Sequence, residues 1–517
     1  MRTASIKNQK PKIKNPFWTL EEHSIGDVTI IRVEDEYHLF TEQTPLEYEP
    51  PLDGKRTVGH AVSKDLFHWE ELPTTIGCGP PGSFDAFTIY HMDVFHHEGK
   101  FYQYYTGLDI SEPGQQQAVG LAISEDGIHW EKHPDNPVLR ADPRWYEPAI
   151  PKEATYQEKD FGRLWFRDPC IIQEQESGKF GMIVIARDLA HHPDVRGCLA
   201  WATSDDLNRW EPHPPIFSPG RFHTIETPSI FERDGRHYII YMTHQGWGAP
   251  PMVTDPYQTA GNFYAISETG WEGPYLPPED EVLLAAHGQM RMGAQRTVDG
   301  PDGERYLYGW LILKPSEDDA QVELKHGMVM PPPRKIRFLD DGRMQPIYNA
   351  DIESFTSPVE IDTGSVSPLP EEEDHWEVHD GRAIGKHFKT RTISLLPGKY
   401  KDFIFSAKVE FLRGERAGLV LRTATDGSRG LQVVADRRYG RVEFGILGSD
   451  SFIDARSCTL KDEFELRIIA LDYSIEVYLD DSLLIHQVRH REKSGAIGFL
   501  VDRGEAQFVS AELLEFE

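Results

Sequence analysis

Short apolar or alternating segments, separated by Gly, Pro, Asn and Asp, follow one another along the chain. Residues 165–188 show the pattern most clearly. Asp168 begins one strand, Gly178 and Lys179 form a turn, and an apolar strand returns over residues 180–186, as in a β-hairpin. Because this shape recurs, the sequence predicts an all-β protein.

A turn motif with Ser in the first position, Asp in the third and Trp in the seventh occurs three times. Each copy follows a short apolar strand, and an aromatic-rich strand lies further upstream. Hairpin, third strand, turn and fourth strand make one antiparallel unit, and five units predict a five-bladed β-propeller. Ordinary loops of a β-sandwich are the alternative explanation of the turns. The motifs lie at 63–69, 124–130 and 204–210, with a degenerate copy at 267–271; the aromatic-rich strands lie at 36–40, 100–105, 179–185, 236–241 and 304–310.

The repeat ends near residue 345. Residues 346–375 are rich in Ser, Pro and acidic residues, a composition that predicts a linker. From 376 to 517 short alternating strands resume between Gly and Asp turns, which indicates a β-sandwich. We therefore expect a propeller over residues 1–345, the linker, and a C-terminal β-sandwich that gives packing support. A sugar-contacting accessory role for the sandwich is the alternative.

The length and net charge of the chain limit the classes of function that fit the sequence. A chain of 517 residues is too long for a single core. Its net charge of −30 disfavours nucleic acid and anionic membranes as partners and suits a neutral substrate, although the charge also serves solubility. The four scattered cysteines and an N-terminus without an apolar stretch predict reduced thiols and a cytoplasmic protein. The extra β domain is compatible with a homo-oligomer.

Acidic residues stand near the start of the first strand in successive units. In a propeller these strands line the central channel, so their first side chains meet at one mouth. Several carboxylates in one funnel cannot all ionise freely, and we expect at least one raised pKa. The residues are Asp27, Asp93, Asp168 and Glu226, with Gln295 in the fifth unit.

Two carboxylates of different pKa on opposite sides of a bond are what glycosidic cleavage requires. A metal hydrolase is less well supported, because no His pair with ligand spacing flanks the acids. A serine hydrolase lacks its Gly-x-Ser-x-Gly turn. We expect no organic cofactor and no catalytic metal, while a structural ion in the channel is compatible with the acids.

Several short motifs occur in a fixed order along the chain: the blade turns at 59–69 and 130–139, Phe-Arg-Asp-Pro at 166–169, Glu-Thr-Pro at 226–228, and a segment at 327–330 with Pro333 and Arg334. They resemble motifs of the family 32 glycoside hydrolases, which include invertases, inulinases, levanases and related fructosidases. The resemblance covers nearly the whole chain. It implies a propeller, closed by the segment at 327–330 and followed by a β-sandwich, and cleavage of a fructofuranoside linkage, with retention, in an oligosaccharide. We expect a short one, since a cytoplasmic enzyme meets imported substrates.

The resemblance also implies roles for individual residues. Asp168 would stabilise the transition state by holding sugar hydroxyls, and Arg167 would hydrogen-bond the same ring. Glu226 would act as general acid/base. Asp27 would be the nucleophile, because it begins the first blade where the family has Asn-Asp-Pro-Asn-Gly.

The sequence departs from the family pattern around the expected sugar site. Asp27 lacks the neighbouring Asn and Pro residues, and Thr227 replaces the Cys of the Glu-Cys-Pro motif. Residues 90–93, Tyr-His-Met-Asp, stand where the family has small Ser and Gly. We expect His91, Asp93 and Gln295 to contact substrate, with a structural pairing of His91 and Asp93 under the channel as the alternative.

Three other functions stay open from the sequence. An inverting arabinofuranosidase or xylosidase similar to family 43 shares the propeller and the acidic trio, although Arg167 before Asp168 favours the fructosidase. A carbohydrate-binding protein derived from a hydrolase would explain the changes around Asp27. Transglycosylation, in which another sugar replaces water as acceptor, is a variant of the hydrolase.

Overall fold

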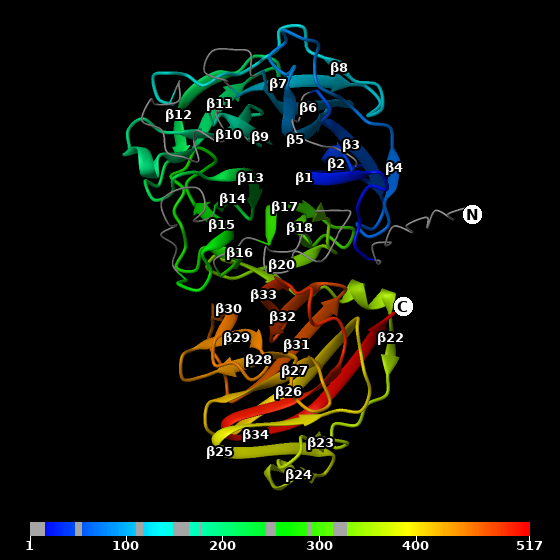
Figure 1. The fold of residues 1–517 in the computed structure, drawn as a ribbon. Helices are drawn as coiled ribbons and strands as arrows, with labels where there is room; N and C mark the ends of the chain where they lie inside the picture. The colour runs from blue at the N-terminus through cyan, green and yellow to red at the C-terminus, as the bar shows by residue number, and fades with distance from the viewer. Residues whose placement is uncertain are drawn as a thin grey trace, which may run out of the picture.

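The computed structural model describes residues 16–46, 54–109, 117–147, 165–175, 177–243, 255–287, 291–313 and 328–517. Figure 1 shows two bodies, an upper one of sheets arranged around a centre and a lower one of longer strands. Strands dominate both, which confirms the predicted all-β class. Among the described residues no helix has the length and apolar character needed to cross a membrane. The short 3₁₀ helices include η1 (Pro193–Val195), η4 (Ala350–Phe355) and η5 (Glu373–His375).

The upper body has a β-propeller arrangement. Four separate four-stranded antiparallel sheets follow one another along the chain, and within each sheet the strands pair in sequence order. This is the unit predicted from the repeated motif. The first two sheets contain β1 (His23–Val33), β2 (Glu36–Pro45), β3 (Thr57–Ser63) and β4 (Glu70–Leu72), then β5 (Thr88–His97), β6 (Lys100–Leu108), β7 (Gln117–Ser124) and β8 (Glu131–Lys132). The next two contain β9 (Arg167–Gln173), β10 (Phe180–Arg187), β11 (Gly197–Ser204) and β12 (Glu211–Phe217), then β13 (Glu226–Arg233), β14 (Arg236–Thr243), β15 (Ala260–Ser267) and β16 (Val282–Ala286).

The repeated turn is built from side-chain hydrogen bonds. The Ser63 hydroxyl accepts from the Leu66 amide at 3.0 Å, and Asp65 accepts from the His68 amide at 2.8 Å. Equivalent bonds form at Ser124 and Ser204, because Ser and Asp side chains cap the backbone in tight turns. The motif tryptophans, Trp69, Trp130 and Trp210, pack on the apolar cores.

A further group of strands completes the upper body. It consists of β17 (Met292–Asp299), β18 (Arg305–Ile312), β19 (Met328–Val329), β20 (Arg334–Phe338) and β21 (Met344–Ile347). Trp18 pairs with Met330 through two backbone hydrogen bonds of 2.9 and 2.8 Å, so the first described residues join the last strands of this body. Gly327 of the expected closing segment lies outside the described residues.

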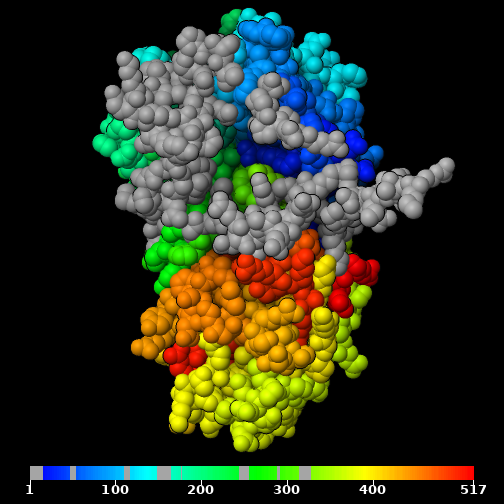
Figure 2. All heavy atoms as spheres, viewed as in Figure 1, coloured from blue at the N-terminus to red at the C-terminus, as the bar shows by residue number. Residues whose placement is uncertain are grey.

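The first strands of the successive sheets contact one another in a closed ring. β1 packs against β5, β5 against β9, β9 against β13, β13 against β17, and β17 against β1. In Figure 1 these strands surround the centre of the upper body. In the space-filling view, blue atoms of the first strands and green atoms from around residue 300 meet in a hollow (Figure 2).

The lower body continues from the upper one, because β17 to β34 form one hydrogen-bonded system of 18 strands. β34 is shared between two groups of strands. Its residues 496–501 pair with β25 and β27, and its residues 513–516 pair with β22 and β26. One apolar core includes Leu419 and Val433 together with Phe405 and Ile468. The strands are β22 (Thr356–Val359), β23 (Ser367–Pro368), β24 (Trp376–His379), β25 (Arg382–Leu395), β26 (Phe403–Arg413), β27 (Arg416–Thr423), β28 (Leu431–Asp436), β29 (Arg441–Ile446), β30 (Phe452–Ser457), β31 (Glu463–Leu471), β32 (Ser474–Leu479), β33 (Ser482–Val488) and β34 (Ala496–Phe516).

The segment expected to be a linker is part of the sheets. Residues 346–375 contain η4, β22 and β23, and β22 and β23 pair with β34 and β25. Ile352 and Leu369 are buried there, because these two apolar side chains fill gaps at the edges of the cores. Composition alone therefore missed the strand pairings of this segment.

Polar contacts join the two bodies. Buried Arg334 on β20 binds Glu476 on β32 and approaches His486 Nδ1 at 3.1 Å. The Gln258 amide donates to Asp454 at 2.9 Å. A second apolar core includes residues of both bodies, among them Tyr264 and Ile469. The bodies therefore share buried surface as well as backbone pairing.

A buried ion pair holds the ring of first strands together. Arg296 on β17 donates to Asp93 Oδ1 on β5 at 2.8 Å, and also binds the Thr29 hydroxyl on β1. Asp93 Oδ2 accepts from the Ile171 amide on β9 at 2.7 Å. Arg296 and Asp93 are both nearly inaccessible to solvent, so four of the ring strands depend on one pair of charges.

We predict that Arg296→Met destabilises the protein by about 3–5 kcal/mol, because it leaves the Asp93 carboxylate buried without its counterion. Denaturant unfolding measures the loss. Arg305→Met is the matched control on the next strand, since its partner Asp299 is more than half exposed and such pairs contribute at most about 1 kcal/mol. Equal effects of the two substitutions would contradict the assignment.

Candidate active site

Each strand of the inner ring has a register shift near its start. The shifts leave unpaired residues that include Asp27 in β1, His91 in β5, Asp168 in β9, Thr227 in β13 and Gln295 in β17. Such β-bulges bend a strand and redirect its side chains. Pro after Asp168 and after Thr227 favours the irregularity, because Pro cannot donate a ladder hydrogen bond.

The backbone is strained at three of these bulges. Asp168, Thr227 and Ala294 have φ values of 59°, 45° and 49°, in the left-handed region that costs non-glycine residues energy. Asp tolerates this region better than Thr or Ala. The surrounding sheets therefore hold the first residues of β9, β13 and β17 in conformations that an isolated strand would not adopt.

Asp27 is held by two side chains from other sheets. Trp310 Nε1 on β18 donates to Asp27 Oδ1 at 2.7 Å, and His91 Nδ1 on β5 lies 3.2 Å from Oδ2. Burial tends to raise the pKa of Asp27, but hydrogen bonding and charge from His91, with the Trp310 bond, lower it below its ordinary value. Asp27 is thus an oriented carboxylate that stays ionised.

Asp168 lies at the junction of three sheets. Its amide donates to the Thr106 hydroxyl on β6 at 2.9 Å, and its Oδ2 accepts from the Thr227 amide on β13 at 3.0 Å. Burial raises the pKa of Asp168 above its ordinary value, against the opposing charge of Arg167. The expectation of at least one raised pKa among the channel acids is met here.

Arg167 connects the second and third acids. Its Nε lies 3.6 Å from Asp168 Oδ1, and its Nη2 forms an ion pair with Glu226 Oε1. The guanidinium also stacks on Trp165, 4.3 Å from the ring centre. A planar guanidinium fixed on three sides is well suited to orient a carboxylate.

Two of the three acids predicted from the sequence lie close together. Oxygen atoms of Asp27 and Asp168 and a nitrogen of His91 all lie within 4.8 Å of one another. Glu226 is connected to this group through Arg167. Among the described residues, this same group of two carboxylates and one imidazole has a spacing that could also hold a cation.

Three residues expected to contact substrate are held by other protein groups. His91 is fully buried behind Asp27, where its backbone amide also donates to Glu42. Asp93 is taken up by the Arg296 ion pair. Gln295 is fully buried and donates to the Gly293 carbonyl at 3.1 Å within its own strand. All three have structural contacts, but the alternative pairing of His91 with Asp93 does not form, because His91 pairs with Asp27 and Asp93 with Arg296.

The sequence interpretation missed Glu42, a buried acid beside Asp27. Glu42 forms an ion pair of 3.0 Å with Arg56. Burial raises its pKa to about 7; Arg56 opposes the rise and Asp27 adds to it. One signal was present, since Glu42 is the one acid in the otherwise apolar and neutral run from Tyr37 to Pro45. Trp310, which orients Asp27, had no signal apart from its place in an aromatic strand.

Comparison with known proteins gives one family along most of the chain. Residues 28–346 match the model of the glycosyl hydrolases family 32 N-terminal domain. A sucrose-6-phosphate hydrolase of Zymomonas mobilis is 25% identical over 470 residues, which are 87% of this chain and 80% of the relative. An extracellular exo-inulinase of Aspergillus niger is 30% identical over 278 residues, 48% of this chain and 46% of the relative.

Solved structures share the fold. A sucrose-6-phosphate hydrolase from Lactobacillus gasseri has a TM-score of 0.67 at 17% identity, over 96% of this chain and 92% of that one. A family 32 β-fructofuranosidase from Bombyx mori has a TM-score of 0.66 at 16% identity, over 97% and 93%. The family model begins directly after Asp27, so that residue lies outside the match. Because the model covers more than half of the chain, the chain belongs to glycosyl hydrolase family 32 and is a glycosyl hydrolase.

Proposed function

We propose that the protein hydrolyses the fructofuranosidic bond of short oligosaccharides, with retention of configuration. The observation that supports this most directly is the proximity of Asp27 and Asp168, with Glu226 tied to Asp168 by Arg167, at the bulged ends of three inner strands. The names of the relatives, which include sucrose-6-phosphate hydrolase, levanase and exo-inulinase, agree in acting on fructosyl sugars.

In the first step Asp27 attacks the anomeric carbon of the fructosyl ring. The bonds from Trp310 and His91 keep it ionised and aimed, which is what a carboxylate nucleophile requires. Glu226 donates a proton to the leaving oxygen, and then takes a proton from water as water attacks the fructosyl-enzyme. The same residue serves as acid and then as base because the second step is the reverse of the first, with water in place of the leaving group.

Asp168 and Arg167 hold the ring during both steps. Asp168 Oδ1 accepts from sugar hydroxyls while Oδ2 stays fixed by the Thr227 amide. Hydrogen bonds that strengthen as the oxocarbenium-like transition state forms lower the barrier. Arg167 places Glu226 and Asp168 around one ring.

We also infer the finer architecture. β17, β18, β20 and β21 form the fifth blade of the propeller, which the ring contact of β17 with β1 and β13 supports. The strands from β22 onward form a β-sandwich around the core that contains Phe405 and Val433. The four cysteines are free thiols, which supports a cytoplasmic location.

Glu226→Gln should lower kcat on sucrose by about 10²–10⁴-fold, the usual contribution of general acid–base catalysis. Substrates with an excellent leaving group, such as an aryl fructofuranoside, need no proton and should retain the rate of their first step. Glu232→Gln is the matched control, because Glu232 lies exposed on the same strand. An unchanged rate on sucrose would remove Glu226 from this role.

Retention predicts that the first product released from a β-fructofuranoside is the β anomer. NMR spectra recorded within the first turnovers, before mutarotation, measure it. Appearance of the α anomer first would assign an inverting mechanism and would make Asp27 a base that activates water.

In this mechanism Glu42 is a neutral neighbour of the nucleophile in acidic solution. The unfolded chain ionises this carboxyl near its ordinary pKa of 4.5, and the folded protein near 7. Between these values the folded state binds more protons, so its stability falls as pH rises. The loss is on the order of 3 kcal/mol.

Glu42→Gln should remove this part of the pH dependence. We expect the difference in unfolding free energy between about pH 5 and pH 8 to shrink by most of that amount. Denaturant unfolding at both pH values gives the comparison. Glu36→Gln is the control, because Glu36 lies on the same strand and is exposed. An identical pH dependence in Glu42→Gln and the parent would refute the shifted ionisation.

A further inference from the structure

The lower body carries a group of buried charges on the outer face of one sheet. Side chains alternate along β27, so Leu419 and Leu421 face the core and Arg416 lies on the opposite face. Asp436 on β28 and Glu443 on β29 lie on the same outer face, as does Asp502 on β34. These three acids are 0%, 7% and 3% exposed. An outer sheet face ordinarily keeps its charges in water, because burying them is costly.

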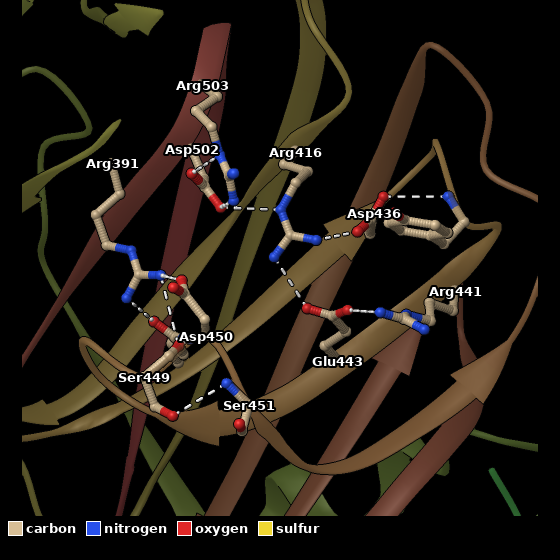
Figure 3. Close-up of polar contacts among 12 residues, drawn as sticks. Arg391, Arg416, Asp436, Arg441, Glu443, Ser449, Asp450, Ser451, Asp502 and Arg503 are labelled. Carbon is tan, nitrogen blue, oxygen red and sulfur yellow. Dashed lines mark hydrogen bonds and ion pairs between the residues drawn. The ribbon is translucent and has the colours of Figure 1, made fainter. Parts of the chain in front are cut away.

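The charges form one connected group around Arg416 (Figure 3). Its guanidinium donates to Asp502 Oδ2 at 2.9 Å and to Glu443 Oε2 at 3.0 Å, and it binds Asp436 as well. Arg441 donates to the other oxygen of Glu443 at 2.8 Å. Every carboxylate of the group is therefore fixed in direction, and Asp502 also accepts from Arg503 at 3.0 Å.

A second polar group continues across the same face. Arg391 on β25 donates to Gln432 Oε1 at 3.2 Å and to Asp450 Oδ1 at 3.1 Å. The Gln432 amide donates to the Ser449 carbonyl at 3.1 Å. Figure 3 shows Arg391, Ser449 and Asp450 beside the Arg416 group. A row of polar side chains thus crosses neighbouring strands on this face of the sheet.

A cavity of about 470 Å³ opens beside the Arg416 group. Its lining includes Arg416, Asp502 and Tyr439. The Tyr439 side chain is 58% exposed, and Arg441 lies against its ring at 4.9 Å from the centre. Cavities of this size take small organic ligands, and an exposed, braced aromatic ring offers a flat apolar surface to one of them.

We propose that this cavity is a second sugar-binding site, which takes the fructosyl end of a neutral fructan. The lining carboxylates, Glu415 and Asp502, accept hydrogen bonds from vicinal hydroxyls. Arg416 and Arg503 donate to the same hydroxyls, and Tyr439 packs on the C–H face of the ring. The choice of fructosyl ligand rests on the proposed function of the upper body.

The pairing of the charges favours a neutral ligand over an anion. Both signs of charge line the cavity, with Glu415 and Asp502 among four arginines, and Arg416 is already bound by three carboxylates. Arg503 and Arg437 at the rim are paired with Asp502 and Asp462. A polyhydroxy ligand uses both signs of charge and brings no counter-charge of its own.

Affinity electrophoresis of the full chain in gels containing inulin tests the proposal, and hydrolysis of sucrose is assayed separately. Tyr439→Ala should weaken the apparent binding of inulin by about 10-fold or more, because it removes one of two linked contacts with the polymer. Glu415→Gln should weaken it as well, because Glu415 lines the cavity, while sucrose hydrolysis stays unchanged. Phe388→Ala is the matched control, because Phe388 is a half-exposed aromatic residue of the same body outside the cavity.

Inulin binding that is unchanged in both Tyr439→Ala and Glu415→Gln would overturn the proposal. So would retardation by dextran sulfate that Arg503→Ala abolishes, since that result would assign an anion site. A parent protein that fails to hydrolyse sucrose would refute the proposed function alone, because the dependence of inulin binding on Tyr439 is measured independently of turnover.

Discussion

The contact on which the upper body depends most is the buried pair of Arg296 and Asp93. A ring of strands leaves polar backbone and side-chain groups near its axis, where water alone would have to satisfy them. Arg296 reaches past β1 to Asp93, and Asp93 also takes the Ile171 amide. Ile171 lies three residues after Asp168, so the charge pair fixes the strand that carries one of the three acids.

The site places carboxyl groups of one chemical kind in different ionisation states. Asp27 receives hydrogen bonds from a Trp and a His, which lower its pKa; Asp168 and Glu42 are buried with less compensation, and their pKa values rise. The differences come from neighbours on other sheets. The low pKa of Asp27 suits a nucleophile, because an attacking carboxylate must be ionised.

The sequence predicted the strands well because their signals are local. Serine and aspartate caps, aromatic second strands and acids at strand starts all lie within a few residues of the element they define. It predicted through the repeat that Asp27, Asp168 and Glu226 stand at equivalent positions around one axis. The environment of each acid could not be predicted, because His91 and Trp310 are 64 and 283 residues from Asp27.

The same reason explains the errors. His91 and Gln295 lie at bulges like those of the acids, and the local bulge decides whether such a side chain turns toward solvent or into the ring. Asp93 lies two residues further along β5, in a regularly paired position. Residues 346–375 have the composition of a linker, but their partners, β25 and β34, come much later in the chain. Local pattern cannot show pairing with a strand that distant.

The pairing of Trp18 with Met330 has a consequence for synthesis of the protein on the ribosome. The ring lacks its last neighbour until Met330 has emerged from the exit tunnel, so the earlier sheets form an open arc whose terminal edges are unpaired. Such edges are where nascent β proteins associate wrongly. The pairing of Trp18 with Met330 therefore cannot form until more than three hundred further residues have been translated.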